Sequence, residues 1–338
     1  MSGWLARWLP LVLFGCAPEG SLSTLVVSVH YPVAGSGVGG LSSAMQRGVL
    51  EARVGSSFVV EEHSPASEQD AVQQLAEALA PRQGRHLVIA GGEVYASALD
   101  AHDCELGGST VLLLDGKPRP CDGLRSVVLE GFAPAFLAGV LALSAESIAP
   151  RRLAGVIAAA PSREVTRLLR GFQAGSEYVG GNVQTLQLDP LQPEAVGAAL
   201  RSLADAVDVL LVAGDAANSL VLQAVREHNA QNPEQVVRMI GLDQDLSVRE
   251  AELVLGSVVR RYDAEVRSSI LAAQVGAFAP GQVLRGYSDG QTELLINPAY
   301  AEQALARLPF DGCALCQTLK DAVHQAEPAA EAAVAPGE

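Results

Sequence analysis

Short apolar runs alternate with helical segments along most of this 338-residue chain. Each run has the length and the Val, Leu and Ile content of a buried β-strand, and most runs precede a segment with helical spacing of apolar residues. Strands that alternate with helices predict βαβ units and a parallel sheet. The predicted strands are residues 25–29, 56–61, 87–92, 111–115, 153–158, 183–188, 209–213, 237–243 and 253–259, and the predicted helices are residues 42–52, 68–79, 94–102, 135–145, 163–178, 193–204 and 217–227.

The alternation restarts after Ala133, and a chain of this length accommodates two domains. We therefore expect an α/β protein with two doubly wound parallel-sheet lobes joined by crossover strands. The N-terminal lobe is predicted over residues 23–133 and the C-terminal lobe over residues 134–255, and residues 256–326 form a crossover segment that completes both. Aromatic residues make up only 4% of the chain, so Ala, Val and Leu must build the cores. Residues 327–338 are almost entirely Ala, Pro and Glu, which predicts a disordered tail.

The amino-terminal residues 1–15 have the parts of an export signal. Arg7 supplies charge, residues 9–14 are apolar, and a small residue precedes Cys16. A Cys at this place is typical of a bacterial lipoprotein signal, in which the thiol receives acyl chains such as palmitate and becomes the mature N-terminus. The alternative is an ordinary signal peptide with an incidental Cys. The apolar run is too short to span a bilayer, which needs about 20 such residues. We expect residues 16–22 to be a lipidated linker that ties the protein to a membrane on the extracytoplasmic side of the cell envelope.

Four further cysteines, Cys104, Cys121, Cys313 and Cys316, form an even set in a chain predicted to be exported. An even count in an oxidising compartment predicts disulfides, one between Cys104 and Cys121 and one between Cys313 and Cys316. The second pair is either a tight bridge or a redox pair. A zinc site is the alternative for all four, but only one pair has ligand-like spacing, so no metal is expected.

The sequence contains no set of residues that would support catalysis. Its six histidines are scattered without metal-ligand spacing and are predicted to lie on the surface or in loops. It lacks a Gly-x-Ser-x-Gly elbow and a phosphate-loop Lys, and the Gly-rich turn at residues 35–40 does not match a dinucleotide fingerprint. We therefore expect no enzyme activity and no cofactor. The net charge of -15 also argues against nucleic acid or an anionic membrane as the direct partner, because both need basic patches.

Aspartates follow three of the predicted strands at equivalent places, namely Asp115, Asp215 and Asp243. Ligands of open α/β sheets bind just beyond the carboxyl ends of the strands. A carboxylate there can accept hydrogen bonds from two hydroxyls of a sugar, whereas the alternative role for each Asp is to cap the next helix. Three such residues favour a ligand cleft.

Several pieces of the chain, in their order and spacing, resemble the basic membrane protein or purine-nucleoside-receptor lipoproteins. That family consists of substrate-binding proteins with a type I periplasmic-binding fold, and the resemblance covers most of the mature chain. It is carried by residues 135–142, 171–175, 209–214, 240–245 and 256–260.

The resemblance implies a role for individual residues of the cleft. Asp243 corresponds to the acid that binds ribose hydroxyls, and Asp115 to a second polar contact, made to the base. Gly214 corresponds to a close approach of the backbone to the ligand. Arg260 stands where the family usually has a Lys that reaches the sugar.

The first loop departs from the family pattern at residues 38–42. Leu41 stands where an aromatic ring would stack on the base, next to Ser42, and Leu lacks the flat π-face of an aromatic side chain. The resemblance implies a receptor that delivers a nucleoside-like or other small polar ligand to an ABC-type permease. The altered loop and the extra Cys pairs leave an alternative, in which the cleft has lost its ligand and the lipoprotein has a structural or sensory role in the envelope.

Overall fold

The computed structural model describes residues 24–33, 40–144, 149–158, 163–188, 193–213 and 217–300. The first eight elements are β1 (Val26–His30), α1 (Gly40–Arg53), β2 (Val59–His63), α2 (Glu68–Ala78), β3 (His86–Gly91), α3 (Glu93–Ala101), β4 (Thr110–Leu114) and β5 (Leu124–Leu129). The next nine are α4 (Phe132–Ser144), β6 (Leu153–Ala158), α5 (Arg163–Tyr178), β7 (Asn182–Gln187), α6 (Pro193–Ala204), β8 (Val209–Ala213), α7 (Ala217–Gln231), β9 (Arg238–Leu242) and β10 (Val254–Arg260). The last are α8 (Tyr262–Gln274), β11 (Gly281–Arg285), the short 3-10 turn η1 (Tyr287–Asp289) and β12 (Thr292–Ile296).

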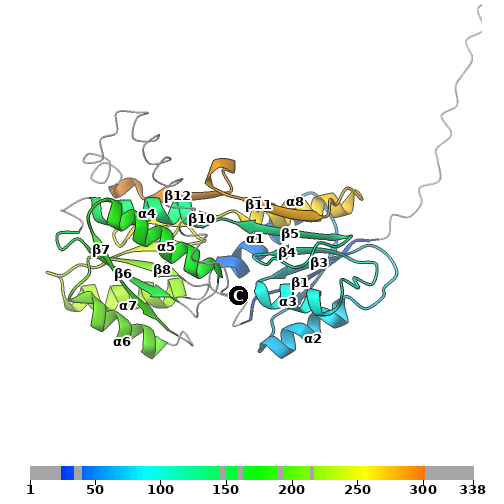
Figure 1. Ribbon diagram of the computed structural model, residues 1–338, viewed down its shortest axis with the longest axis horizontal. Coiled ribbons are helices and arrows are strands. Elements are labelled where there is room, and N and C mark those ends of the chain that lie inside the picture. The colour runs from blue at the N-terminus through cyan, green and yellow to red at the C-terminus, as the bar shows by residue number, and fades with distance from the viewer. Residues whose placement is uncertain are drawn as a thin grey trace, which may run out of the picture.

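These elements form two lobes that lie side by side, each with one sheet covered by helices (Figure 1). The N-lobe sheet has the strand order β11-β5-β4-β3-β1-β2 and the C-lobe sheet the order β12-β10-β9-β8-β6-β7. Among the described strands every neighbouring pair is parallel except β12, which runs antiparallel to β10. The predicted fold class is confirmed.

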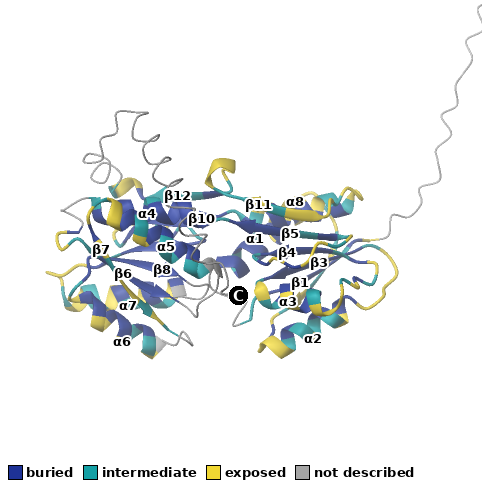
Figure 2. Ribbon diagram, in the orientation of Figure 1, coloured by how far each residue is buried: buried dark blue, intermediate teal, exposed yellow. Residues whose placement is uncertain are grey.

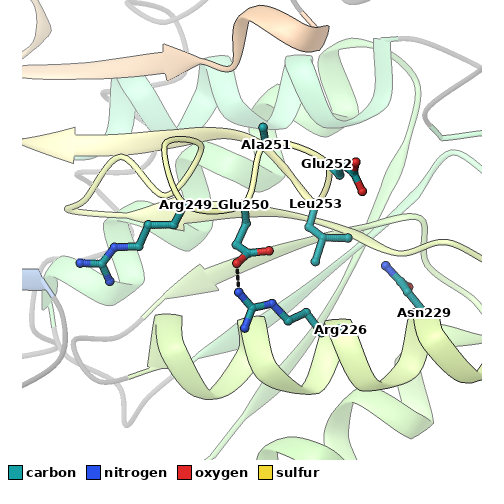
Figure 3. Close-up of a pocket in the computed structure, with 7 residues that line it drawn as sticks. All are labelled: Arg226, Asn229, Arg249, Glu250, Ala251, Glu252 and Leu253. Atoms are coloured by element: carbon teal, nitrogen blue, oxygen red, sulfur yellow. Dashed lines mark ion pairs between the residues drawn. The ribbon is translucent and has the colours of Figure 1, made fainter.

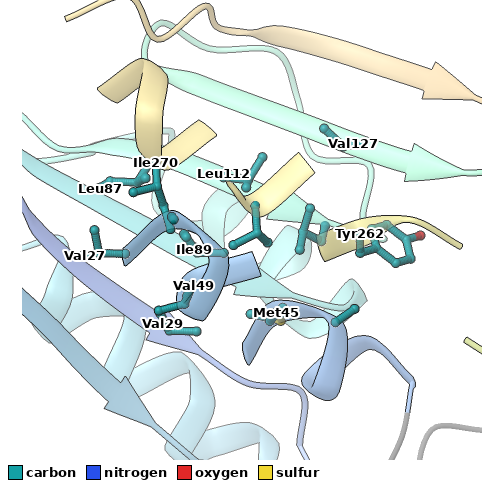
Figure 4. Close-up of a cluster of buried hydrophobic side chains, with 14 of the residues drawn as sticks. Val27, Val29, Met45, Val49, Leu87, Ile89, Leu112, Val127, Tyr262 and Ile270 are labelled. Atoms are coloured by element: carbon teal, nitrogen blue, oxygen red, sulfur yellow. The ribbon is translucent and has the colours of Figure 1, made fainter. Parts of the chain in front are cut away.

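The central strands are apolar along their whole length because helices cover both faces of each sheet. Central strands β3, β8 and β10 are buried at every position (Figure 2). In the N-lobe, α1 and α8 pack on one face through Met45, Val49 and Ile270, together with strand residues such as Ile89 (Figure 4). Helices α2 and α3 cover the opposite face.

The chain passes between the lobes three times. It leaves the N-lobe after β5 and enters α4, returns at Arg261 between β10 and α8, and crosses again between β11 and β12. Helix α8 and strand β11 therefore complete the N-lobe, and β12 completes the C-lobe. The sequence patterns had not assigned β5, α8, β11 or β12, and they placed the strand now seen as β2 three residues too early. The hydroxyl of Ser56 hydrogen-bonds back to the carbonyl of Ala52, so the predicted start of that strand belongs to the turn that follows α1.

Two local features tighten the fold. A disulfide joins Cys104 to Cys121 with a Cα–Cα distance of 6.1 Å, which confirms the predicted bridge. Helices α4 and α5 approach so closely that a Cβ at Gly175 would overlap the carbonyl oxygen of Phe136. Cys16, Cys313, Cys316 and the predicted tail lie outside the described residues.

Within the described ranges, none of the helices is long and apolar enough to span a bilayer.

Candidate functional site

The two predicted aspartates of the strand ends occupy the same place in the two lobes. Asp115 directly follows β4, and Asp243 directly follows β9. Their φ angles are 59° and 60°, and the backbone N–H of each donates to the neighbouring strand, to the carbonyls of Val127 at 2.9 Å and Val258 at 2.7 Å. This left-handed conformation costs a residue other than Gly roughly 1–2 kcal/mol and is least unfavourable for Asp and Asn. Each lobe therefore holds an aspartate in a strained turn, a feature that clusters at functional sites.

Arg260, the last residue of β10, joins these two aspartates. Its Nε donates to Oδ1 of Asp243 at 2.7 Å and its Nη2 to Oδ2 at 2.6 Å, a bidentate pair. Its Nη1 donates to Oδ2 of Asp115 at 3.2 Å. Because Asp115 belongs to the N-lobe and Arg260 to the C-lobe, this ion pair connects the two lobes.

Tyr262 completes the group from the first residue of α8. Its hydroxyl donates to Oδ1 of Asp115 at 2.8 Å and accepts from the backbone N–H of Leu129 at 3.3 Å. The guanidinium carbon of Arg260 lies 5.2 Å from the centre of the Tyr262 ring, in cation–π contact. The sequence patterns did not predict Tyr262 as a site residue. The signal that could have indicated it is its position two residues after Arg260, where the chain crosses between the lobes. We call Asp115, Asp243, Arg260 and Tyr262 the interlobe cluster.

The interlobe cluster lies almost out of contact with solvent. The side chains of Arg260, Asp243 and Asp115 are 6%, 0% and 13% exposed. Burial raises the pKa of Asp115, against the opposing effect of the Arg260 charge. Burial alone would lower the pKa of Arg260, but the carboxylates of Asp243 and Asp115 hold it well above its usual value. In this closed arrangement the carboxylates of Asp243 and Asp115 accept hydrogen bonds from Arg260 and Tyr262.

The other predicted ligand residues lie elsewhere or outside the described residues. Leu41 is 4% exposed and packs in the N-lobe core, where a Cβ at Gly91 would lie 3.0 Å from its Cδ2 atom. Ser42, also in α1, is buried. Gly214 is not among the described residues, and neither are the segments that follow β1, β6, β7 and β8, which are residues 34–39, 159–162, 189–192 and 214–216.

Two surface hollows lie away from the interlobe cluster. The larger, about 400 Å³, lies between α7 and residues 249–253, where Arg226 pairs with Glu250 (Figure 3). The other is lined by residues of α1 and α8 and by Arg261. Over the described ranges, no three His, Cys, Asp or Glu side chains are arranged to hold a metal ion.

Two buried histidines correct the expectation that histidines lie on the surface or in loops. His30 in β1 and His86 in β3 are 0% and 6% exposed. His30 stacks on His63 at the end of β2, with ring centres 4.3 Å apart and planes 8° apart. Burial, followed by the neighbouring His63 and His86, lowers the pKa of His30 to about 3. His86 instead hydrogen-bonds to Ser28 and Ser109, each at 2.8 Å, which explains why it tolerates the sheet interior.

Several solved structures have a fold similar to that of this chain. Solved structures with similar folds include an ABC-transporter solute-binding protein from Aeropyrum pernix K1, at TM-score 0.69 and 18% identity over 92% of this chain and 89% of that one. A transcriptional activator of the comK gene from Bacillus halodurans matches at TM-score 0.63 and 18% identity, over 93% and 99% of the two chains. An ABC-transporter solute-binding protein from Agrobacterium vitis, bound with alpha-D-tagatopyranose, matches at TM-score 0.59 and 13% identity, over 84% and 98%. At these identities the matches show the fold alone.

The sequence itself matches one protein family over most of its length. A comparison with curated proteins gave no match. The family Bmp, described as "ABC transporter substrate-binding protein PnrA-like", matches residues 41–292, a stretch that includes the interlobe cluster and every strand except β1 and most of β12. This family consists of extracytoplasmic substrate-binding proteins rather than enzymes, as the sequence predicted. The chain belongs to the PnrA-like family of ABC-transporter substrate-binding proteins.

Proposed function

We propose that this protein is a lipid-anchored receptor that binds a small neutral, hydroxyl-bearing ligand between its lobes and delivers it to an ABC-type permease. A nucleoside is the ligand class that the sequence resemblance favours. The observation that carries the proposal is the convergence of Asp115 and Asp243, from equivalent strand ends of the two lobes, on Arg260 between them. Family membership supports the class of function.

In this proposal Asp243 is the strongest polar anchor of the ligand. Arg260 fixes the plane of its carboxylate through two hydrogen bonds, so the remaining lone pairs point in defined directions. Vicinal hydroxyls can donate to these lone pairs. Asp115 offers the second contact from the opposite lobe, and Gly214 is the further ligand residue that the family resemblance implies. Closure of the two lobes about their crossings is a known motion of binding proteins.

The ligand proposal can be tested by calorimetry with a panel of nucleosides, free bases and sugars. Asp243→Ala should lower the affinity for a ribose-bearing ligand by about two orders of magnitude, because charge-assisted hydrogen bonds contribute about 1.5–3 kcal/mol each. Asp208→Ala is the matched control. Asp208 is also buried and also pairs with an arginine, Arg151 at 2.8 Å, but it precedes β8 instead of following a strand. Equal affinity in the two variants would contradict the assignment of Asp243.

The anchor can be tested separately at Cys16. Acyl chains contribute about 0.8 kcal/mol for each buried methylene, so two or three chains hold a protein firmly on a membrane. Cys16→Ser should release the protein into the soluble fraction or leave it unprocessed. A variant of mature size that still fractionates with membranes would show that this thiol is not the anchor.

One observation favours a second candidate function, a ligand-free envelope lipoprotein with a structural or sensory role. Arg260 already bonds both oxygens of Asp243, and Leu41 is packed into the core. Such a protein would give no heat and no thermal shift with any nucleoside, base or sugar. A saturable response to any member of the panel would exclude this second candidate.

A further inference from the structure

Four segments meet where the described chain enters the N-lobe, at the end of the sheet opposite the interlobe cluster. We call them the amino edge; they are residues 24–26, 53–59, 82–85 and 274–280. Val26 N–H donates to the carbonyl of Arg85 at 3.0 Å, and the guanidinium of Arg85 donates to the carbonyl of Gln274. The side-chain amide of Gln274 donates to the carbonyl of Ser57 at 3.2 Å. These hydrogen bonds hold the loops of the amino edge around the start of β1.

The amino edge exposes apolar side chains to solvent. Residues 275–280 read Val-Gly-Ala-Phe-Ala-Pro, without a charged or hydrogen-bonding side chain, and all but Phe278 are exposed. Val275 is 77% exposed, and Val54 at the end of α1 is 84% exposed. The hydrogen bond from Gln274 to Ser57 joins the segments that carry these side chains, and exposed apolar surface of this kind marks an interaction site.

Arginines flank this apolar surface on a protein whose net charge is -15. Arg53 is exposed and reaches over the ring of Phe58, Arg85 lies between the loops, and Arg82 pairs with Glu61. Glu51, two residues before Arg53 in α1, is an exposed acidic residue in this part of the helix. Each basic side chain near an anionic membrane surface contributes about 1 kcal/mol to the binding free energy. The amino edge is therefore better suited to such a surface than the acidic remainder of the protein.

The length of chain before β1 identifies the partner. Only eight residue steps separate Cys16 from Thr24, which span at most about 29 Å. We propose that the amino edge rests on the lipid surface that Cys16 enters, with Val54 and residues 275–280 in the headgroup region and Arg53 among the lipid phosphates. This inference rests on the acyl anchor proposed above.

The chain offers a clean optical test of this contact. Its two tryptophans, Trp4 and Trp8, lie in the predicted signal, so the processed protein contains none. Val275→Trp therefore introduces a single fluorescent probe at the amino edge. Val248→Trp is the matched control, because Val248 is 83% exposed but lies in the C-lobe between β9 and β10. Each processed variant is purified from membranes, its mass is measured, and it is inserted into phosphatidylglycerol vesicles with brominated acyl chains.

If the amino edge contacts lipid, bromine should quench the Val275→Trp probe on the order of tenfold more than the Val248→Trp probe, because interfacial side chains enter about 5–10 Å into the headgroup and acyl boundary. Adding Val54→Asp should lower that quenching. Equal quenching of the two probes on an acylated protein would overturn the inference and leave the anchor intact. A mass without acyl chains would overturn the anchor and the inference with it. A probe that shifts with protein concentration but is not quenched by brominated lipid would show that a second copy covers this surface.

Discussion

Arg260→Met should destabilise the protein strongly, because it leaves Asp243 buried with an uncompensated charge. The substitution removes two hydrogen bonds to Asp243, of 2.7 and 2.6 Å, and one to Asp115, of 3.2 Å. Breaking a buried ion pair by removing one partner costs about 3–5 kcal/mol. For a protein of this size that loss corresponds to a fall in Tm on the order of 10 °C. Circular dichroism during thermal unfolding measures the change.

Two further variants distinguish the loss of a buried ion pair from the general effect of replacing an arginine on stability. Arg226→Met is the surface control, because Arg226 is 52% exposed in its ion pair with Glu250, and exposed pairs contribute about 0–1 kcal/mol. Asp243→Asn combined with Arg260→Met should recover part of the lost stability, because Asp243 then carries no charge, while Asp115 keeps only its hydrogen bond from Tyr262. A loss for Arg260→Met no larger than that for Arg226→Met would refute the view of the interlobe cluster as a desolvated ion network.

Three more predictions concern the contribution of residues within one lobe to the stability of the protein. His30 titrates near pH 3 in the folded protein and at 6.5 when unfolded, so the unfolded state binds more protons below pH 6.5 and stability falls as the pH falls. Urea unfolding should show a loss of about 2 kcal/mol from this residue between pH 7 and pH 5, and His30→Phe should remove that part of the loss. Replacing Cys104 and Cys121 together by Ser should lower stability by roughly 3 kcal/mol, measured as a shift of the denaturant midpoint, and a reducing agent should abolish the difference. Gly175→Ala should destabilise the C-lobe by about 1–3 kcal/mol through overlap between α4 and α5, whereas Gly197→Ala, which meets only the end of a flexible arginine side chain, should not.

The sequence patterns predicted the central strands well because these strands are buried on both faces and therefore read as uninterrupted apolar runs. Strands β11 and β12 lie at the sheet edges and are only partly buried, so their residues lack that signal. Helix α8 begins directly after the buried strand β10, and the single residue between them, Arg261, is not one that indicates a turn. Its assignment to the N-lobe depends on packing against α1, which lies more than 200 residues earlier.

The sequence indicated individual residues of the candidate site but not the contacts that those residues make with one another. Strand ends and family resemblance pointed to Asp115, Asp243 and Arg260, and the structure brings the three together. Their mutual pairing was not predictable, because the partners Asp115 and Arg260 are 145 positions apart and belong to different lobes. Tyr262 was not predicted because it also acts through a residue that is distant in the sequence. Its hydroxyl donates a hydrogen bond to Asp115 of the preceding N-lobe segment.

The three passages of the chain between the lobes determine the order in which the protein can be completed. Synthesis runs from the amino end, so α8 and β11 appear only after the C-lobe as far as β10 has been made. Until then Met45 and Val49 of α1 lack the helix that packs beside them, and β5 lacks its neighbour β11. A chain that stops at residue 260 therefore exposes apolar surface on its first lobe, and such intermediates are prone to aggregate. The N-lobe therefore begins first and is finished late.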